Sequence, residues 1–159
     1  MSKRNERDVE WTAYDRGEIA FRRKELSNAV GGDQLGCSLY ELEPGTRSWP
    51  YHYHTANEEA LFVLDGKGTV RLEDGEASLE AGDFVALPAD ERGGHQVVND
   101  GDESLRYLAM STMVEPDVTI YPEMGKLGVY VGSPPGGRDG RSVHGYYPID
   151  GDVDYWEDE

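Results

Sequence analysis

Turn-forming residues recur at short intervals along this chain, and no segment between them keeps a helical repeat of apolar residues for three turns. Short segments of alternating polarity between such residues are typical of strands. The pattern therefore predicts an all-β domain with little helix. We expect strands near residues 18–24, 35–43, 48–54, 59–65, 67–73, 76–80, 83–87, 95–99, 104–113, 117–121 and 127–131.

The clearest chain reversal is the pair Asp74-Gly75, which lies between two alternating segments. Asp-Gly commonly supplies the two positive-φ positions of a type I′ hairpin turn, so we expect a hairpin of that type here. Gly66 and Gly82 mark further tight reversals. Many short strands in 159 residues are typical of one jelly roll or β-barrel domain.

The chain is strongly acidic, with 32 Asp and Glu against 15 Lys and Arg and a formal net charge of -17. Such a surface repels phosphate backbones and anionic membranes, so we expect neither nucleic acid nor membrane as a partner. Acidic residues are spread through the chain and Lys is scarce, which suggests a halophilic protein whose carboxylate repulsion is screened by salt. An ordinary acidic cytosolic protein is the alternative.

The single cysteine, Cys37, excludes an internal disulfide, and we expect a buried structural thiol without a chemical role. The charged N-terminal residues lead into no apolar run, which predicts neither a signal peptide nor a membrane anchor. A cytoplasmic location is therefore expected.

The chain divides by composition into three parts. We expect an N-terminal extension with one added strand over residues 1–33, a barrel over 34–131, and an acidic tail over 132–159 that begins with a Pro- and Gly-rich loop. Aromatic residues of the tail are predicted to dock on the barrel or on a second subunit, with disorder as the alternative.

Two histidines, His52 and His54, alternate with Tyr51 and Tyr53. On a strand both imidazoles then point to one face, about 6.6 Å apart along the backbone. From there both side chains can reach one ion.

Two further side chains join them by the same alternation. Glu59 shares a strand face with Leu61 and Val63, and His95 shares one with Val97. Neutral imidazole and carboxylate are ligands that Mn, Fe, Co, Ni, Cu and Zn accept, and four of them leave positions open for water or substrate. We predict one divalent transition metal ion on His52, His54, Glu59 and His95; a metal-free barrel that uses these histidines for hydrogen bonds is the alternative.

Other candidate side chains are set aside. Glu58 is the rival carboxylate, but alternation turns it outward, and a loop histidine such as His144 is more often solvated than ligating. The tyrosines at 51 and 53 face away from the metal, as does Trp49 unless Pro50 breaks the strand. The basic run at 21–24 is expected to be a strand edge with local ion pairs.

These residues resemble the cupin superfamily. The segment from Gly45 to Gly66 is similar to the first cupin motif, with six residues instead of five before His52. The second motif is matched by Gly82, Pro88, His95 and Asn99, with two extra residues before His95. The chain also resembles a group of uncharacterised single-domain bacterial and archaeal cupins. The resemblance implies a double-stranded β-helix (a cupin jelly-roll barrel), a metal inside its wider mouth, and a homodimer.

Function is less sharply indicated. The leading hypothesis is a metal-dependent enzyme acting on a small oxygenated metabolite, with dioxygenase, isomerase and decarboxylase chemistry all open. The alternative is a non-catalytic cupin that binds a metabolite or the metal as a sensing or storage module. A catalytic site should place a second reactive polar group near the metal, whereas a binding module should present a mostly apolar pocket. No catalytic residue is identified from the sequence.

Overall fold

A computed structural model describes residues 2–137 and 139–156. Strands dominate this part of the chain, and its helical segments are four single 3₁₀ turns, η1 (Glu6–Asp8), η2 (Asn28–Val30), η3 (Glu91–Gly93) and η4 (Pro122–Met124). The all-β prediction is confirmed. In chain order the strands are β1 (Thr12–Arg16), β2 (Ile19–Glu25), β3 (Leu35–Leu42), β4 (Tyr53–His54), β5 (Glu59–Asp65), β6 (Lys67–Leu72), β7 (Gly75–Glu80), β8 (Phe84–Leu87), β9 (His95–Val98), β10 (Leu105–Thr112), β11 (Asp117–Tyr121), β12 (Lys126–Val131) and β13 (Val143–Pro148).

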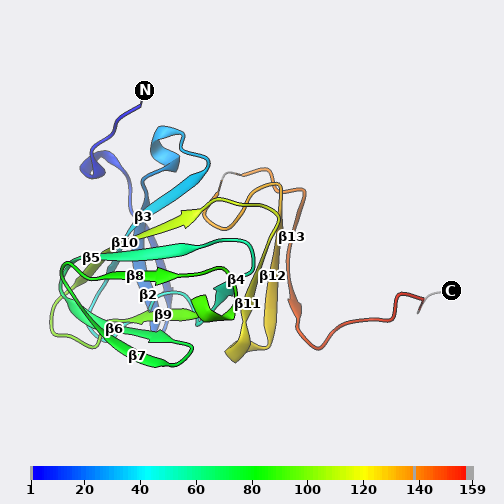
Figure 1. The fold of residues 1–159 in the computed structure, drawn as a ribbon. Helices are drawn as coiled ribbons and strands as arrows, with labels where there is room; N and C mark the ends of the chain where they lie inside the picture. Colours follow the sequence, from blue (N-terminus) through cyan, green and yellow to red (C-terminus); the bar gives the residue numbers. More distant parts are fainter. Residues whose placement is uncertain (1, 138, 157–159) are drawn as a thin grey trace.

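The strands form three antiparallel groups. A six-stranded sheet has the order β1-β2-β3-β10-β5-β8, a three-stranded sheet has the order β7-β6-β9, and a four-stranded sheet has the order β13-β12-β11-β4. The first two sheets lie across from each other, and the four-stranded sheet stands at one end of them (Figure 1). This arrangement is the expected jelly-roll barrel.

The barrel interior is filled by the inward-facing residues of these strands. Along β5, Leu61 and Val63 are buried while Phe62 and Leu64 are exposed, as a half-buried strand requires. Each buried aliphatic side chain contributes about 1.5–3 kcal/mol relative to its exposed state. The aliphatic core consists of Leu42, Leu61, Val63, Val70, Leu79, Leu87, Val97 and Leu105.

Ten of the eleven expected strands are present with bounds shifted by at most one residue. The exception is the segment 48–54, of which only Tyr53 and His54 form a strand. Pro50 has no N–H to donate to a ladder, and the segment joins its neighbours through single bridges, such as His52 to His95. Two strands, β1 and β13, were not expected.

The hairpin between β6 and β7 is present, but the predicted type I′ turn is wrong. Leu72 pairs with Gly75, so the loop residues are Glu73 and Asp74, one position earlier than expected. Gly75 has a φ of 140°. Among the described residues that are not glycine, only Asp90 has a positive φ, so Asp74 does not. Asp74 therefore lacks the conformation that a type I′ turn needs.

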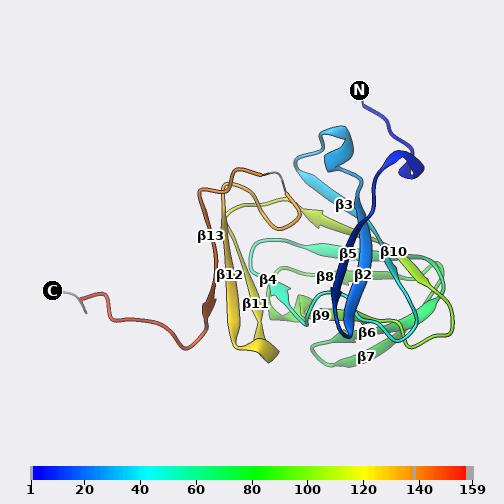
Figure 2. The same cartoon turned by 180° about the vertical axis from the view of Figure 1, so that it is seen from behind.

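The basic run at 21–24 is not at a sheet edge, because β2 lies between β1 and β3 (Figure 2). Its expected local ion pairs are present. Arg22 pairs with Glu41, and Lys24 Nζ lies 2.6 Å from Glu6 Oε2. The N-terminal segment thus extends the six-stranded sheet instead of hanging beside it.

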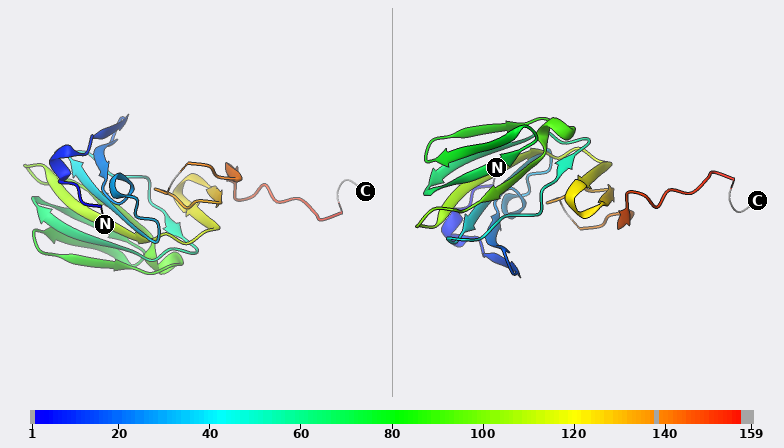
Figure 3. Two further views of the ribbon diagram at one scale, coloured as in Figure 1. Left: turned by 90° about the horizontal axis from the view of Figure 1, so that it is seen from above. Right: turned by 90° about the horizontal axis from the view of Figure 1, so that it is seen from below.

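The expected tail divides into a docked part and an exposed part. Residues 143–148 form β13, which pairs with β12 from Val131↔Val143 to Lys126↔Pro148. Beyond it the described chain runs away from the barrel (Figures 1 and 3), and Tyr155 and Trp156 are 86% and 63% exposed. Docking on the barrel therefore holds for β13 alone.

Among the described residues, no helix has both the length and the apolar character needed to cross a membrane.

Candidate metal centre

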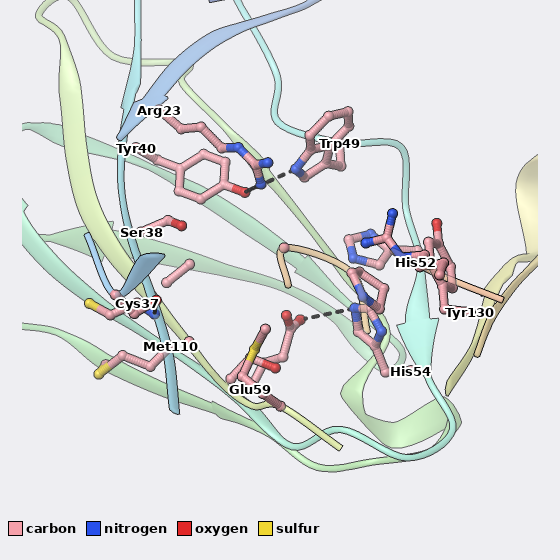
Figure 4. A pocket seen from close by; sticks show the side chains of 18 of the residues that line it. Arg23, Cys37, Ser38, Tyr40, Trp49, His52, His54, Glu59, Met110 and Tyr130 are labelled. Atoms are coloured by element: carbon pink, nitrogen blue, oxygen red, sulfur yellow. Dashed lines mark hydrogen bonds and ion pairs between the residues drawn. The ribbon is translucent and has the colours of Figure 1, made fainter. Parts of the chain in front are cut away.

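Three of the four predicted ligands form a tight group at the end of the barrel next to the four-stranded sheet. The potential ligand atoms of His52, His54 and Glu59 all lie within 4.8 Å of one another. His54 Nε2 is 3.5 Å from Glu59 Oε2, an approach drawn as a dashed line in Figure 4. Both imidazoles are buried, and the Glu59 side chain is 20% exposed.

His95 adjoins this group from the first position of β9. Its main chain exchanges two hydrogen bonds with His52, of 3.2 and 3.0 Å, so the two residues face each other directly. Its Nε2 lies 3.6 Å from Glu59 Oε2, the same oxygen that His54 approaches. The structure thus brings all four predicted side chains together, with Glu59 between His54 and His95.

The three imidazoles share one hydrogen-bonding pattern, which tests whether they suit a metal. Each Nδ1 faces an acceptor oxygen, and this arrangement favours the neutral tautomer that has its proton on Nδ1 and a free lone pair on Nε2. Protein-bound metals use such a pattern, in which the far ring nitrogen is held by an outer acceptor. The acceptors are the Pro50 carbonyl for His52 (2.9 Å), Asp117 Oδ2 for His54 (2.7 Å) and the Gly93 carbonyl for His95 (2.9 Å).

Electrostatics keeps two of these rings neutral. Burial, followed by the neighbouring imidazoles, holds the pKa of His52 well below its ordinary value, and burial also lowers the pKa of His95. Burial opposes protonation of His54 too, but Glu59 and Asp117 outweigh it and raise the pKa of that ring. Neutral imidazole is the form that binds metals, so His52 and His95 are ready ligands.

Asp117, at the start of β11, is a functional residue that the sequence analysis missed. It is 1% exposed, and besides His54 it accepts a hydrogen bond of 3.0 Å from the Ala56 N–H. Burial disfavours the carboxylate, yet His54, the Ala56 N–H and Asn57 together outweigh it and lower the pKa of Asp117. The only signal was a polar residue alternating with Val118 in a strand, which reads as an outward position.

The two extra residues before His95 also have a structural role. They belong to the loop around η3, where a Cβ on Gly93 would lie 2.0 Å from the Pro88 carbonyl oxygen and one on Gly94 would lie 2.3 Å from Tyr51 Oη. Only glycine permits such close packing without a shift. The loop thereby positions the Gly93 carbonyl to accept a hydrogen bond from His95 Nδ1.

A cavity of about 250 Å³ opens beside the cluster. Its walls combine apolar, aromatic and polar side chains (Figure 4), and they come from the barrel strands, the four-stranded sheet and the connection between β12 and β13. Besides His52, His54 and Glu59, the lining side chains used below are Arg23, Tyr40, Trp49, Tyr121, Tyr130, Arg141, His144 and Tyr146.

The structure decides one open expectation about neighbouring residues and corrects two others. Pro50 does break the strand, so Trp49 does not face away: the indole turns inward, and its Nε1 donates to Tyr40 Oη at 3.0 Å. His144 lies on β13 instead of a loop, and although exposed it stacks on Tyr130 with ring centroids 4.8 Å apart. Cys37 is half-buried and lines the cavity, with its pKa raised by burial.

The family model described as "Cupin domain" matches residues 38–111. This chain contains a cupin domain. The matched segment includes all four clustered side chains and the core strands around them. A search of the curated proteins found no match.

Solved cupin structures are similar over most of the chain. A candidate sugar phosphate isomerase from Acidithiobacillus ferrooxidans is 28% identical, with a TM-score of 0.77 over 92% of this chain and 88% of that one. A cupin from Silicibacter pomeroyi described as a sugar phosphate isomerase is 25% identical, with a TM-score of 0.80 over 94% of each chain. The polyketide cyclase RemF from Streptomyces resistomycificus shares the fold, at 22% identity and a TM-score of 0.58 over 70% of this chain and 78% of that one.

Proposed function

We propose that this cupin is a metal-dependent enzyme of isomerase type that acts on a small oxygenated metabolite. His52, His54, Glu59 and His95 would hold one divalent transition metal ion, and this ligand set leaves positions for substrate oxygens. When bound, the ion supplies Lewis-acid polarisation of a substrate carbonyl or hydroxyl group.

The observation that carries the proposal is the chemical character of the cavity next to the cluster. A module that only binds a metabolite favours a mostly apolar pocket with a few fixed hydrogen bonds. Here the lining side chains outside the cluster include groups that donate hydrogen bonds, carry charge or transfer protons. A second reactive group beside a metal site is what catalysis requires.

Tyrosine hydroxyls on the four-stranded sheet supply donors at this cavity. Tyr121 stacks on His52 with ring centroids 5.7 Å apart, and burial raises the pKa of Tyr121 to about 12. Tyr130 Oη lies 3.0 Å from Tyr146 Oη, and burial together with that hydrogen bond raises the pKa of Tyr130 as well. These hydroxyls therefore keep their protons and stabilise substrate oxygens as donors, not as bases.

Proton transfer is assigned to His144. Within the described chain it is the only imidazole that lines the cavity outside the metal cluster. Its ring is positioned between Tyr130 and Tyr146, at centroid distances of 4.8 and 5.6 Å. Imidazole is the commonest general acid–base group in enzymes, and an aldose–ketose isomerisation through an enediol moves a proton from one carbon to the next.

The isomerase class is favoured over the other open classes by similarity. Two structures that align with more than nine-tenths of this chain are described as sugar phosphate isomerases, one of them as a candidate. Such a reaction moves two hydrogens within one molecule and needs no oxidant, so a metal site and one acid–base side chain suffice.

The assembly and setting of the enzyme belong to the same proposal. We infer a salt-adapted cytoplasmic homodimer, supported by the net charge of -17 and by exposed apolar side chains on the C-terminal segment, among them Val153 at 74% and Trp156 at 63%. Light scattering at low and high potassium chloride tests both parts. A monomer at every salt concentration contradicts the dimer.

The test of function combines metal analysis with isotope exchange. The purified protein should contain about one transition metal ion per chain, and His54→Ala and His95→Ala should lose it. In D₂O the metal-loaded protein should exchange the C2 hydrogen of a suitable aldose or a C1 hydrogen of the matching ketose, monitored by NMR. Glu59→Gln should also lose metal. Its matched control is Glu58→Gln, because Glu58 is exposed beside the cluster and should not affect the metal content. Substrate binding without exchange would support the sensing or storage alternative.

A further inference from the structure

The cavity beside the metal cluster has cationic side chains, although the chain as a whole is strongly acidic. Arg23 from β2 and Arg141 from the connection between β12 and β13 line the same cavity as His52, His54 and Glu59. A protein with a net charge of -17 repels small anions over most of its surface. Two guanidinium groups on one cavity therefore favour a ligand that carries negative charge.

Arg141 is held in place without being neutralised. Its Nε and Nη2 donate to the carbonyl oxygens of Ser133 and Pro134, at 2.9 and 2.8 Å, and its Cζ lies 5.0 Å from the Tyr130 ring centroid. No carboxylate of the described residues forms an ion pair with it. Six other described arginines do have such partners: Arg22, Arg23, Arg47, Arg71, Arg92 and Arg106.

Arg23, whose side chain lines the same cavity, retains one unused donor. Its Nη2 pairs with Glu25 Oε1 at 2.7 Å and its Nη1 donates to Tyr40 Oη at 3.4 Å. Its Nε is buried and has no hydrogen-bond partner within the described chain. A buried N–H without an acceptor is unfavourable and rare, and it leaves Arg23 with a donor that an ordered water or a ligand can satisfy after a small shift of the side chain.

The position of Arg23 relates it to the cluster. Figure 4 shows Arg23, with Tyr40 and Trp49, on the side of the cavity opposite Glu59 and His54. The guanidinium is packed over the Trp49 and Tyr14 rings, at 5.7 and 5.6 Å, so its orientation is fixed before any ligand enters. A ligand that spans the cavity would meet the cluster with one end and Arg23 with the other.

We propose that Arg23 and Arg141 bind the anionic end, a phosphate or carboxylate group, of the metabolite whose oxygenated end reaches the metal cluster. This inference rests on the proposed function for its second half. Guanidinium groups match the oxygens of both anions through paired N–H donors, and a cavity of about 250 Å³ admits only a small molecule. The cations thus select which oxygenated metabolite enters an otherwise repulsive protein.

Calorimetric titration of the metal-loaded full chain with ribose 5-phosphate, ribonate and ribose tests the inference. At constant ionic strength, one or both anions should bind roughly tenfold or more tighter than ribose, because charge-assisted hydrogen bonds are added. Their difference tells phosphate from carboxylate. Arg141→Gln and Arg23→Gln should each remove most of that preference, whereas Arg16→Gln, an exposed charge on β1 outside the cavity, should keep it.

Two further measurements separate this inference from the metal proposal. Metal per chain should stay at the wild-type value in both variants, and Arg23→Lys, which keeps a charge, covers the case in which Arg23→Gln does not fold. If the wild type binds no metal, titration of wild type and Arg141→Gln with inorganic phosphate still tests the cationic site. Equal affinity for ribose and its anionic relatives, or an unchanged preference in Arg141→Gln, overturns the inference.

Discussion

The two ends of the barrel interior use the same strands for different purposes. Along the inner face of β5, Glu59 is followed by Leu61 and Val63, and along β9, His95 is followed by Val97. The first residue of each series lies in the polar cluster, and the later ones lie in the aliphatic core. Alternation decides which side chains point inward, and position along the strand decides whether they stabilise the fold or face the cavity.

The largest expected effect on folding is at the apolar end. Leu61→Ala removes a side chain that is 2% exposed and should lower the free energy of unfolding by about 3 kcal/mol. Denaturant unfolding of the metal-free protein measures this. Metal content per folded chain should not change, and loss of metal in the folded variant would show that the two ends are not separate.

Two positions earlier on the same strand the effect should move from folding to binding. Glu59→Gln should weaken metal affinity by about 100-fold or more, since a charged ligand is lost, while metal-free stability changes by less than about 1 kcal/mol. Competition with a metal chelator measures the affinity, with Glu58→Gln as control. Equal affinity in the two variants would contradict the role of Glu59.

A smaller effect is expected behind the cluster. Asp117→Asn keeps the size of the side chain but removes the charge that faces His54 Nδ1, so metal affinity should fall about 10- to 100-fold. The same chelator competition applies, and circular dichroism should show the wild-type fold. An unchanged affinity would show that the charge of Asp117 does not contribute to metal binding.

The smallest effect should come from the outer face of β5. Leu64 is 42% exposed, so Leu64→Thr should change the free energy of unfolding by only about 0.5 kcal/mol and should not change the metal affinity. The denaturant and chelator measurements above serve here too. A large change in either quantity would show that the outer face is covered, for example by a second subunit.

Most of the fold could be predicted from the sequence because strand alternation and turn residues are local signals. The strands at 59–65 and 117–121 were expected with their observed bounds. The strands β1 and β13 could not be predicted in this way, since their side chains are largely exposed and β13 lies beyond a Pro- and Gly-rich connection. The strand expected at 48–54 is mostly absent for another reason: Pro50 interrupts the ladder, so alternation counted from His52 does not extend to Trp49.

The candidate site was predictable only where residue type itself carries chemistry. Histidines are rare in this chain, so three of them at strand positions stood out. Asp117 and Arg23 are two among many charged residues, and what distinguishes them is their burial beside His54 or on the cavity. Arg141 meets the cavity through a connection between strands, and no periodicity predicts where such a connection lies.

The hydrogen bonds behind the three imidazoles also bear on how this protein can diverge. His52 and His95 are oriented by peptide carbonyls, which every amino acid possesses, whereas His54 is oriented by two side chains, the Asp117 carboxylate and the Thr119 hydroxyl. Genetic drift at position 50 or 93 can alter those carbonyls only by deforming the chain. A single substitution at position 117 removes the carboxylate. Homologues that keep the fold but lose the metal site should therefore differ first at this position.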